Sequence, residues 1–192
     1  MFRSVSFLVF ITAMTGCSVF GNSGVEIAPY TVLQKEEPYE LRHYERLVLV
    51  TTPYEDIEEQ RNPFMRLFDY ISGANDGTQE IAMTAPVFMD RQGNTSETMS
   101  FVLPESFSLE SAPEPENSAV KLEELKNYTV ATVTFNGLLG TENIEEHNEL
   151  LNQWIAKMEL ETIGPAKVAG YNPPYTIPWM RRNEVLIPVK MP

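Results

Sequence analysis

The stretch from Tyr39 to Thr52 decides the fold, and it reads Tyr-Glu-Leu-Arg-His-Tyr-Glu-Arg-Leu-Val-Leu-Val-Thr-Thr. Aromatic and β-branched residues, which favour strands, are frequent in it. Apolar and polar residues alternate from Tyr39 to Tyr44, as in a strand with one buried face, whereas the segment from Leu47 onward is apolar on both faces. We therefore expect two strands here, of which the second is buried on both sides.

Two helices follow downstream at the spacing of amphipathic helices. The first carries an apolar stripe at i, i+3, i+4 and i+7, formed by Phe64, Leu67, Phe68 and Ile71. Asn62 and Pro63 suit its start, and Gly73 suits its end. The second helix is expected from about Asn143 to Met158, with its apolar residues on one side.

The remaining periodic segments predict further strands at Ile81–Met89, Met99–Leu103, Tyr128–Phe135, Lys167–Tyr171 and Asn183–Val189. The stretch from Pro104 to Ser118 is rich in Pro, Glu and Ser and predicts a surface loop. Each half of the chain thus has the order strands, helix, strands. This order predicts an α+β domain in which two helices pack on a curved antiparallel sheet with pseudo-twofold symmetry.

The first sixteen residues have the layout of an export signal. Arg3 precedes an apolar run from Val5 to Met14, and small residues stand immediately before Cys17. The run is about half of the roughly 20 apolar residues that a membrane-spanning helix needs. Its end resembles the lipobox of bacterial lipoproteins, which implies that Cys17 is lipidated and becomes the new N-terminus. The alternative is an ordinary signal peptide followed by an incidental cysteine.

This layout divides the chain into a signal peptide at 1–16, a lipidated cysteine with a flexible tether at 17–28, and a single domain at 29–192. Ser18, directly after the cysteine, resembles the pattern that sorts lipoproteins to the outer membrane. We therefore expect a lipid-anchored protein of the bacterial cell envelope, held at the outer membrane and facing the periplasm.

The acidic composition limits the partners of the chain. Its formal net charge is −13, and such a surface repels nucleic-acid phosphates and anionic lipid headgroups. We expect no binding of nucleic acid, membrane contact through the lipid anchor, and a monomer. Cys17 is the only cysteine, so an internal disulfide is impossible.

The sequence lacks the common catalytic motifs. It has no nucleophile elbow, phosphate-binding loop, dinucleotide fingerprint or zinc-protease motif, and it has only two histidines. His147 stands among glutamates, but its spacing from Ile144 and Leu151 places it at the border of an apolar helix face. We therefore predict that the protein is not an enzyme and has no catalytic residues.

Five segments carry a family resemblance: Tyr39–Tyr44, Tyr70–Asn75, Met83–Val87, Gly170–Pro174 and Arg181–Val185. They resemble the SOUL family of haem-binding proteins. Members of that family carry Tyr-Glu-x-Arg-x-Tyr, Tyr-Ile-x-Gly-x-Asn, Met-Thr-Ala-Pro-Val, and Gly-Tyr-x-Pro-Pro with Arg-Arg-Asn-Glu-Val, in this order. The resemblance extends over residues 30–189, nearly the whole predicted domain.

The resemblance implies a distorted antiparallel β-barrel of two pseudo-symmetric halves with two long α-helices, and haem or a related tetrapyrrole as the ligand. It implies an apolar groove beside the first helix, with Arg61 pairing with a propionate. The haem-binding residues in that groove would be Phe64, Leu67, Phe68 and Ile71. The same stripe also fits plain core packing. Asp69 and Thr176 stand where vertebrate members carry lysines, so part of their propionate clamp is absent.

His43 is the candidate iron ligand. In some members of the family a histidine at this strand position is proposed as the axial ligand of haem iron. A neutral imidazole that faces the groove could serve in this way. The alternative is a strand histidine that is hydrogen-bonded at the barrel wall.

The residues and the resemblance together predict a non-enzymatic lipoprotein that binds haem, or a related tetrapyrrole, for sequestration or transfer. One alternative is a structural or interaction lipoprotein whose groove holds a peptide or a lipid. Another is an enzyme that acts on tetrapyrroles.

Overall fold

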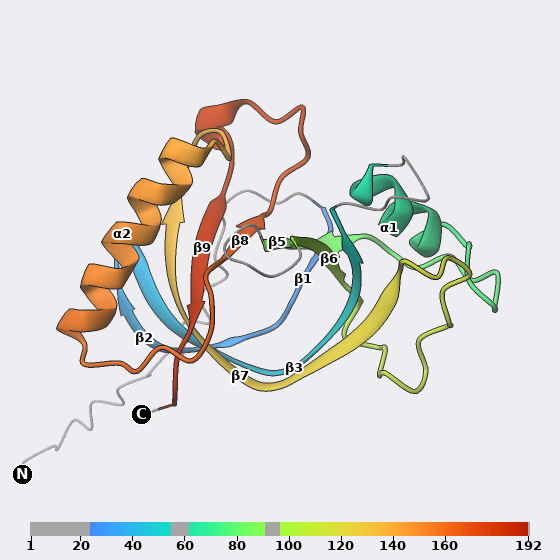
Figure 1. The fold of residues 1–192 in the computed structure, drawn as a ribbon, viewed down its shortest axis with the longest axis horizontal. Helices are drawn as coiled ribbons and strands as arrows, with labels where there is room; N and C mark the ends of the chain where they lie inside the picture. Colours follow the sequence, from blue (N-terminus) through green and yellow to red (C-terminus); the bar gives the residue numbers. More distant parts are fainter. Residues whose placement is uncertain (1–23, 55–61, 91–96, 192) are drawn as a thin grey trace, which may run out of the picture.

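The computed structural model describes residues 24–54, 62–90 and 97–191. Six antiparallel strands close into a barrel: β3 (Tyr39–Pro53), β6 (Thr98–Val102), β5 (Val87–Asp90), β8 (Lys167–Gly170), β9 (Asn183–Pro188) and β7 (Lys121–Phe135), in this order around the wall. The barrel closes because β3 also pairs with β7. One helix lies on each side of it, α1 (Pro63–Ile71) and α2 (Thr141–Lys157) (Figure 1). The predicted α+β barrel with two helices is confirmed.

Three shorter pieces complete the architecture. β2 (Thr31–Glu36) adds to the free edge of β3 as an antiparallel hairpin partner. β1 (Glu26–Ile27) pairs in parallel with β4 (Thr84–Ala85). A short 3-10 helix, η1 (Pro178–Met180), lies in the loop between β8 and β9.

The prediction of two strands between Tyr39 and Thr52 is wrong, because the segment forms the single fifteen-residue strand β3. Tyr44 and Leu47 nevertheless belong to the same internal cluster, although side chains three residues apart in a regular strand point to opposite faces. The alternation therefore changes phase at the exposed pair Glu45 and Arg46. The partner strand changes with it at Asn127, whose φ is 50°, so the register between β3 and β7 stays constant.

This change of phase allows β3 and β7 to serve both halves of the molecule. Both strands form the lower wall of the barrel in Figure 1 and curve from the α2 side to the α1 side. On the α2 side Leu41 packs in the outer cluster under that helix, and on the α1 side Val48 and Val50 do the same under α1. The apolar pattern on both faces of the segment after Leu47 follows from this double burial.

The inside of the barrel holds one apolar cluster. It takes residues from all six barrel strands, among them Tyr44, Leu49, Phe88, Val102, Val130, Ala169 and Leu186. A second cluster lies between α2 and the outer sheet, where Trp154 stacks on Tyr39 at 5.4 Å between ring centroids. The predicted inner face of the second helix is thereby confirmed, since Ile144, Leu151, Trp154 and Ile155 are buried.

The start of α1 is the one that the sequence predicted. The Asn62 side chain accepts a hydrogen bond from the backbone N–H of Phe64 at 2.9 Å, and Pro63 occupies the first helical turn. Gly73 follows the helix with φ at 109°, a conformation that favours glycine.

The buried face of α1 differs in part from the predicted stripe. Leu67 and Ile71 are buried as expected, whereas Phe68 remains 42% exposed and Arg66 is buried in its place. The reason is a polar anchor, because the Arg66 guanidinium donates to the Thr52 hydroxyl at 2.9 Å and to the backbone carbonyl of Pro53. These bonds rotate the helix so that Arg66 faces the sheet.

Two further details concern the ends of segments. The predicted strand Ile81–Met89 is divided into β4 and β5 at Pro86, which has no N–H for a ladder. Backbone pairing begins at Glu26, and Ala28 is buried with its N–H bonded to Ala85, ahead of the predicted domain start at residue 29.

Among the described residues, every helix is too short or too polar to cross a bilayer.

Candidate functional site

A cavity of about 430 Å³ opens at the middle of β3, between the start of β2 and the loop that follows β6. Its lining residues are Pro29, Tyr30, Thr31, His43, Glu45, Arg46, Leu47, Val48, Val102, Leu103, Pro104, Glu105 and Phe107. Its volume lies within the range of about 300–1,000 Å³ that is usual for small-molecule pockets. The β2 ladder on β3 ends at His43 and the β6 ladder begins at Leu49, so the cavity lies where neither ladder covers the edge of β3.

His43 contributes an imidazole to this cavity from the wall of β3. The residue is half-buried and lies opposite Thr129 of β7, and its Nδ1 is 3.0 Å from the Thr129 hydroxyl oxygen. When Nδ1 carries the proton and donates to that hydroxyl, Nε2 keeps its lone pair for a metal. The sequence left open a ligand or a wall histidine, and the structure makes His43 a wall histidine that also lines a cavity.

The rest of the lining combines an apolar floor with charged side chains at the rim. Five of the lining residues are large and apolar: Leu47, Val48, Val102, Leu103 and Phe107. Arg46 supplies a cation, and its guanidinium donates to the backbone carbonyl of Glu105 at 3.3 Å. Glu45 and Glu105 supply two carboxylates to the same lining. Arg46 is the one cation among the lining residues, and it is the group that could pair with a carboxylate of a ligand.

The predicted stripe on α1 does not line this cavity. Leu67 and Ile71 pack in the outer cluster under the helix, and Phe64 packs edge-on against Phe101 with ring centroids 5.2 Å apart. Phe68 stacks on Phe64 at 6.3 Å and faces outward. The two parts of the predicted site are neighbours, since Val48, Leu103 and Phe107 belong both to the cavity lining and to the cluster under α1.

The structure therefore separates the predicted site into a cavity at His43 and a partly exposed aromatic pair on α1. A ligand contact for Phe64, Leu67, Phe68 and Ile71 stays a prediction. Arg61 and Cys17 lie outside the described residues. Within the described ranges, no group of three or more His, Cys, Asp or Glu side chains is arranged to hold a metal ion.

Sequence reasoning did not identify Thr129, Arg46 or Phe107 as parts of this site. Thr129 is a polar residue in an apolar strand, which is a weak signal by itself. Its importance depends on the register that places it opposite His43. Phe107 comes from the segment that the sequence predicted as a surface loop, and nothing in its composition indicates a wall of a cavity.

The Arg-Arg-Asn-Glu segment has a structural role at the end of the barrel. The buried Glu184 carboxylate receives a bidentate pair of hydrogen bonds from Arg42, at 2.7 and 3.0 Å. Arg182 binds the same carboxylate at 2.7 Å, and the Tyr171 hydroxyl donates to it at 2.9 Å. Arg42 also pairs with Glu40 at 2.7 Å. This cluster joins β3 to β9 across the barrel.

The ionisation of this cluster follows from its partners. Burial by itself would raise the pKa of Glu184, but the charges and hydrogen bonds of Arg42 and Arg182 outweigh it, so the pKa lies below its ordinary value. Burial raises the pKa of Tyr44, which lies beside the cluster, to about 12. Glu184 is therefore ionised and Tyr44 is neutral at physiological pH.

The second histidine has a purely structural environment. His147 on α2 stacks on Phe135, with ring centroids 4.2 Å apart, and its Nδ1 lies 2.7 Å from the backbone carbonyl oxygen of Asn143. This agrees with its predicted place at the border of the core.

Comparisons with solved structures bear on the fold alone. An uncharacterized conserved protein from Listeria innocua superposes with a TM-score of 0.59 at 13% identity, covering 81% of this chain and 93% of that one. The C-terminal domain of EcmrR superposes with a TM-score of 0.55 at 13% identity, covering 85% and 99%. The barrel with its two helices is thus an established architecture.

Comparisons of sequence identify the family. A mouse (Mus musculus) protein named Heme-binding protein 1 is 30% identical over 182 residues, covering 88% of this chain and 94% of that protein. A human (Homo sapiens) protein named Heme-binding protein 2 is 31% identical over 159 residues, covering 77% and 76%. The family model described as SOUL heme-binding protein matches residues 25–188. The chain, with its six-stranded barrel and its cavity at His43, therefore belongs to the SOUL heme-binding protein family.

Proposed function

We propose that this protein binds haem, or a related tetrapyrrole, in the cavity at the middle of β3, and that it does so as a lipid-anchored monomer of the bacterial cell envelope. The observation that carries the proposal is His43, whose Nδ1 lies 3.0 Å from the Thr129 hydroxyl oxygen and which lines a cavity of mixed polar and apolar character. The names of the mouse and human relatives support the ligand class. Export, lipidation at Cys17 and a place at the outer membrane facing the periplasm rest on the N-terminal sequence.

The residues of the cavity fit such a ligand. The apolar floor can exclude water from one face of a porphyrin, and Arg46 can pair with a propionate at the rim. Arg61, outside the described residues, is the second candidate for that pairing. Haem iron would supply redox and ligand-binding chemistry when bound, and His43 is the residue placed to coordinate it.

The role that follows is binding for sequestration or transfer rather than catalysis. A protein that transfers a ligand needs a site from which the ligand can leave, and this cavity is open at the surface of the barrel wall, with His43 as the one histidine among its lining residues. An enzyme acting on tetrapyrroles would instead convert haemin when a reductant is supplied. A haem absorption spectrum that stays unchanged during prolonged incubation of the complex with reductant would indicate binding, and a progressive change to a product spectrum would indicate conversion.

Loss of a residue that only orients a metal ligand costs about 10–100-fold in metal affinity. We expect His43→Gln, which removes the ligand itself, to weaken the binding of haemin by more than that. The physical reason is the loss of the imidazole that coordinates iron, with a side chain of similar size left in place. The measurement is a haemin titration of the purified chain, followed through the Soret band.

His147→Gln is the matched control, because it replaces the other histidine of the chain and lies on α2 outside the cavity. It should leave the midpoint and the Soret spectrum unchanged. Equal spectra for the His43 variant and the wild type would contradict coordination by His43. A linear rise in absorbance without saturation, in the wild type, would contradict a defined site.

We expect Thr129→Val to lower haemin affinity by about tenfold without unfolding the protein. Valine keeps the volume of the buried threonine but cannot accept a hydrogen bond from His43 Nδ1–H, so the imidazole loses its orientation and its preferred tautomer. Thr132→Val is the control in the haemin titration, because Thr132 is a buried threonine of the same strand whose hydroxyl donates to the Glu40 carbonyl rather than bonding with His43. A loss that is the same in both variants would mean that Thr129 acts only through stability.

A further inference from the structure

An exposed apolar tip stands at one end of the barrel. It is formed by the β7–α2 loop, residues 136–140, and the β8–β9 loop, residues 171–182, which includes η1. Its large apolar side chains are between 45% and 87% exposed, and they are Leu138, Tyr175, Ile177, Trp179 and Met180. Figure 1 shows the β8–β9 loop projecting beyond the end of α2. Five large apolar side chains exposed together in one region indicate an interaction site.

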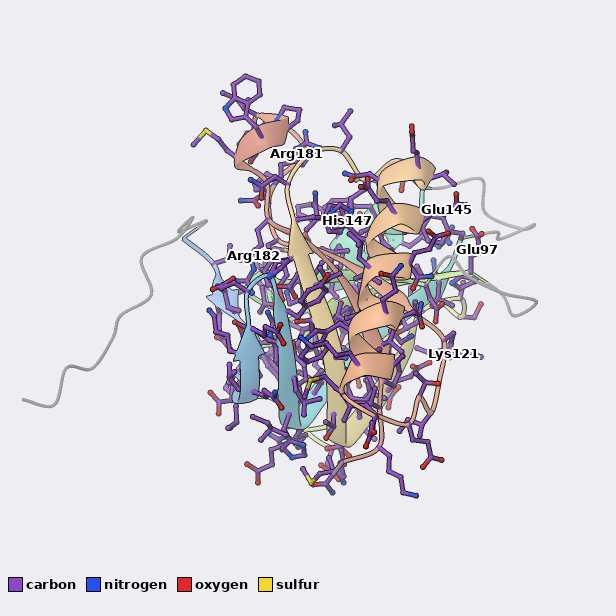
Figure 2. All side chains as sticks on the ribbon, turned by 90° about the vertical axis from the view of Figure 1, so that its left-hand side faces the viewer. Glu97, Lys121, Glu145, His147, Arg181 and Arg182 are labelled. Atoms are coloured by element: carbon purple, nitrogen blue, oxygen red, sulfur yellow. The ribbon has the colours of Figure 1, made fainter. Side chains whose placement is uncertain are left out.

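Hydrogen bonds between and within the two loops fix the conformation of the tip. The backbone N–H of Gly137 donates to Pro178 at 2.9 Å, and the Asn136 amide donates to the carbonyl of Trp179 at 3.0 Å. Arg181 lies at the base of the loop (Figure 2), and its Nε donates to the carbonyl of Thr176 at 2.7 Å. These bonds hold the exposed side chains outward, away from the core.

The charge of the tip is opposite to that of the rest of the chain. The segments 136–140 and 171–182 contain two arginines and no acidic residue, whereas the formal net charge of the whole chain is −13. Arg182 is paired with Glu184, so Arg181 supplies the positive charge of the tip. The first acidic residue after the β7–α2 loop is Glu142, in the first turn of α2. An anionic surface therefore repels the tip less than it repels the acidic remainder of the chain.

We propose that this tip rests in the headgroup region of the bilayer to which the chain is tethered, with Trp179 and Met180 inserted at the interface. This inference rests on the lipid tether proposed above. Tryptophan and tyrosine are the residues that favour the boundary between lipid and water. Apolar area and basic residues together determine how strongly a segment binds at that boundary.

The length of the tether supports this occupant over a protein partner. Eight residues lie between Cys17 and Glu26, where the described strands begin, so the nine Cα–Cα steps between these two residues span at most about 30 Å. A domain of this size has a radius of gyration of about 15 Å, so the bilayer is always within reach of its surface. The tether keeps the membrane at a high effective concentration, and a small contact is then sufficient to orient the domain.

The two tryptophans of the chain provide the test. Trp179 belongs to the tip, whereas Trp154 is buried under α2. The lipidated full chain is purified from membranes and reconstituted in phosphatidylethanolamine and phosphatidylglycerol vesicles, with or without brominated acyl chains. The Trp154→Phe variant reports on Trp179 alone, and the Trp179→Phe variant reports on Trp154 alone. If Trp154→Phe fails to fold, the emission of Trp179 is obtained by subtracting the emission of the Trp179→Phe variant from that of the wild type.

The expected result is that brominated lipid quenches Trp179 and leaves Trp154 unchanged. Met180→Glu should abolish most of that quenching, and Ile163→Glu, at an exposed apolar position in another loop, should not. Equal Trp179 emission in both kinds of vesicle would overturn the inference. Quenching of Trp179 by one equivalent of haemin in solution, with no response to brominated lipid, would assign the tip to the ligand and overturn it as well.

Flotation of the vesicles tests the tether separately. The wild type should float with the vesicles and Cys17→Ser should not. If the wild-type chain does not float, both the lipid tether and the membrane contact of the tip are contradicted. If it floats but brominated lipid does not quench Trp179, only the membrane contact of the tip is contradicted.

Discussion

Replacing Glu184 with glutamine is expected to lower the free energy of unfolding by about 3–5 kcal/mol, which is the usual cost of removing one partner from a buried ion pair. The Glu184 carboxylate is fully buried and binds Arg42 and Arg182 at 2.7 Å each. Without it, the buried Arg42 guanidinium keeps only Glu40 as an anionic partner in the cluster. Urea denaturation of the variant and the wild type measures the difference.

The control for this prediction is an exposed ion pair. Lys190 and Glu161 lie 3.2 Å apart with about two thirds of each side chain exposed. Glu161→Gln should therefore change the free energy of unfolding by less than about 1 kcal/mol. A loss at Glu184 that is no larger than the loss at Glu161 would refute the structural importance of the buried cluster.

The pH dependence of this effect has a defined sign. Glu184 has a pKa below its ordinary value in the folded protein, because its arginine partners outweigh the effect of burial. The stabilisation is therefore complete above the ordinary pKa and is lost as the pH falls through the lower, folded-state pKa. The stability difference between the wild type and Glu184→Gln should narrow in acid. A difference that does not change as the medium is acidified would contradict this explanation.

Replacing Leu67 with alanine is expected to cost about 2–5 kcal/mol of folding free energy while leaving haemin affinity unchanged. Leu67 is completely buried between α1 and the sheet, in the cluster that contains Val50, Phe101 and Ile71. Alanine leaves a cavity there that the sheet cannot close. Urea denaturation measures the stability, and haemin titration under native conditions measures the binding.

Phe68→Ala is the matched control on the same helix. Phe68 is exposed and stacks only on the edge of the core, so its loss should change stability by about 0.5 kcal/mol. If Leu67→Ala retains the stability of the wild type but loses haemin binding, the α1 stripe is a ligand surface and the core assignment is wrong. If Phe68→Ala alone weakens haemin binding, the ligand extends from the cavity onto α1.

Much of the fold could be predicted because local chemistry and tertiary structure agree there. The cap at Asn62, the glycine after α1 and the apolar side of α2 are local features, and each has the predicted role. The stretch from Tyr39 to Thr52 was predicted as strand but divided wrongly. Its pattern contains a change of phase, and a change of phase looks like a strand end when the partner strand is not known.

The candidate site was harder to predict, because it depends on contacts between distant segments. His43 could be selected from the motif, but its partner Thr129 is 86 residues away and is defined by the register with β7. The helical stripe was expected to be a ligand surface or a core. Its actual exposure depends on Arg66, whose bonds to Thr52 and Pro53 set the rotation of the helix.

The sequence by itself determined the local elements, the acidic charge and the family motifs. These features depend on neighbouring residues and on composition, which are present in the chain before it folds. Only the tertiary structure decided that Glu184 meets Arg42 across 142 residues, that His43 lines a cavity and that Leu138 and Trp179 share one exposed tip. Closure of the barrel places these residues together, and strand register is a property of paired segments rather than of either one alone.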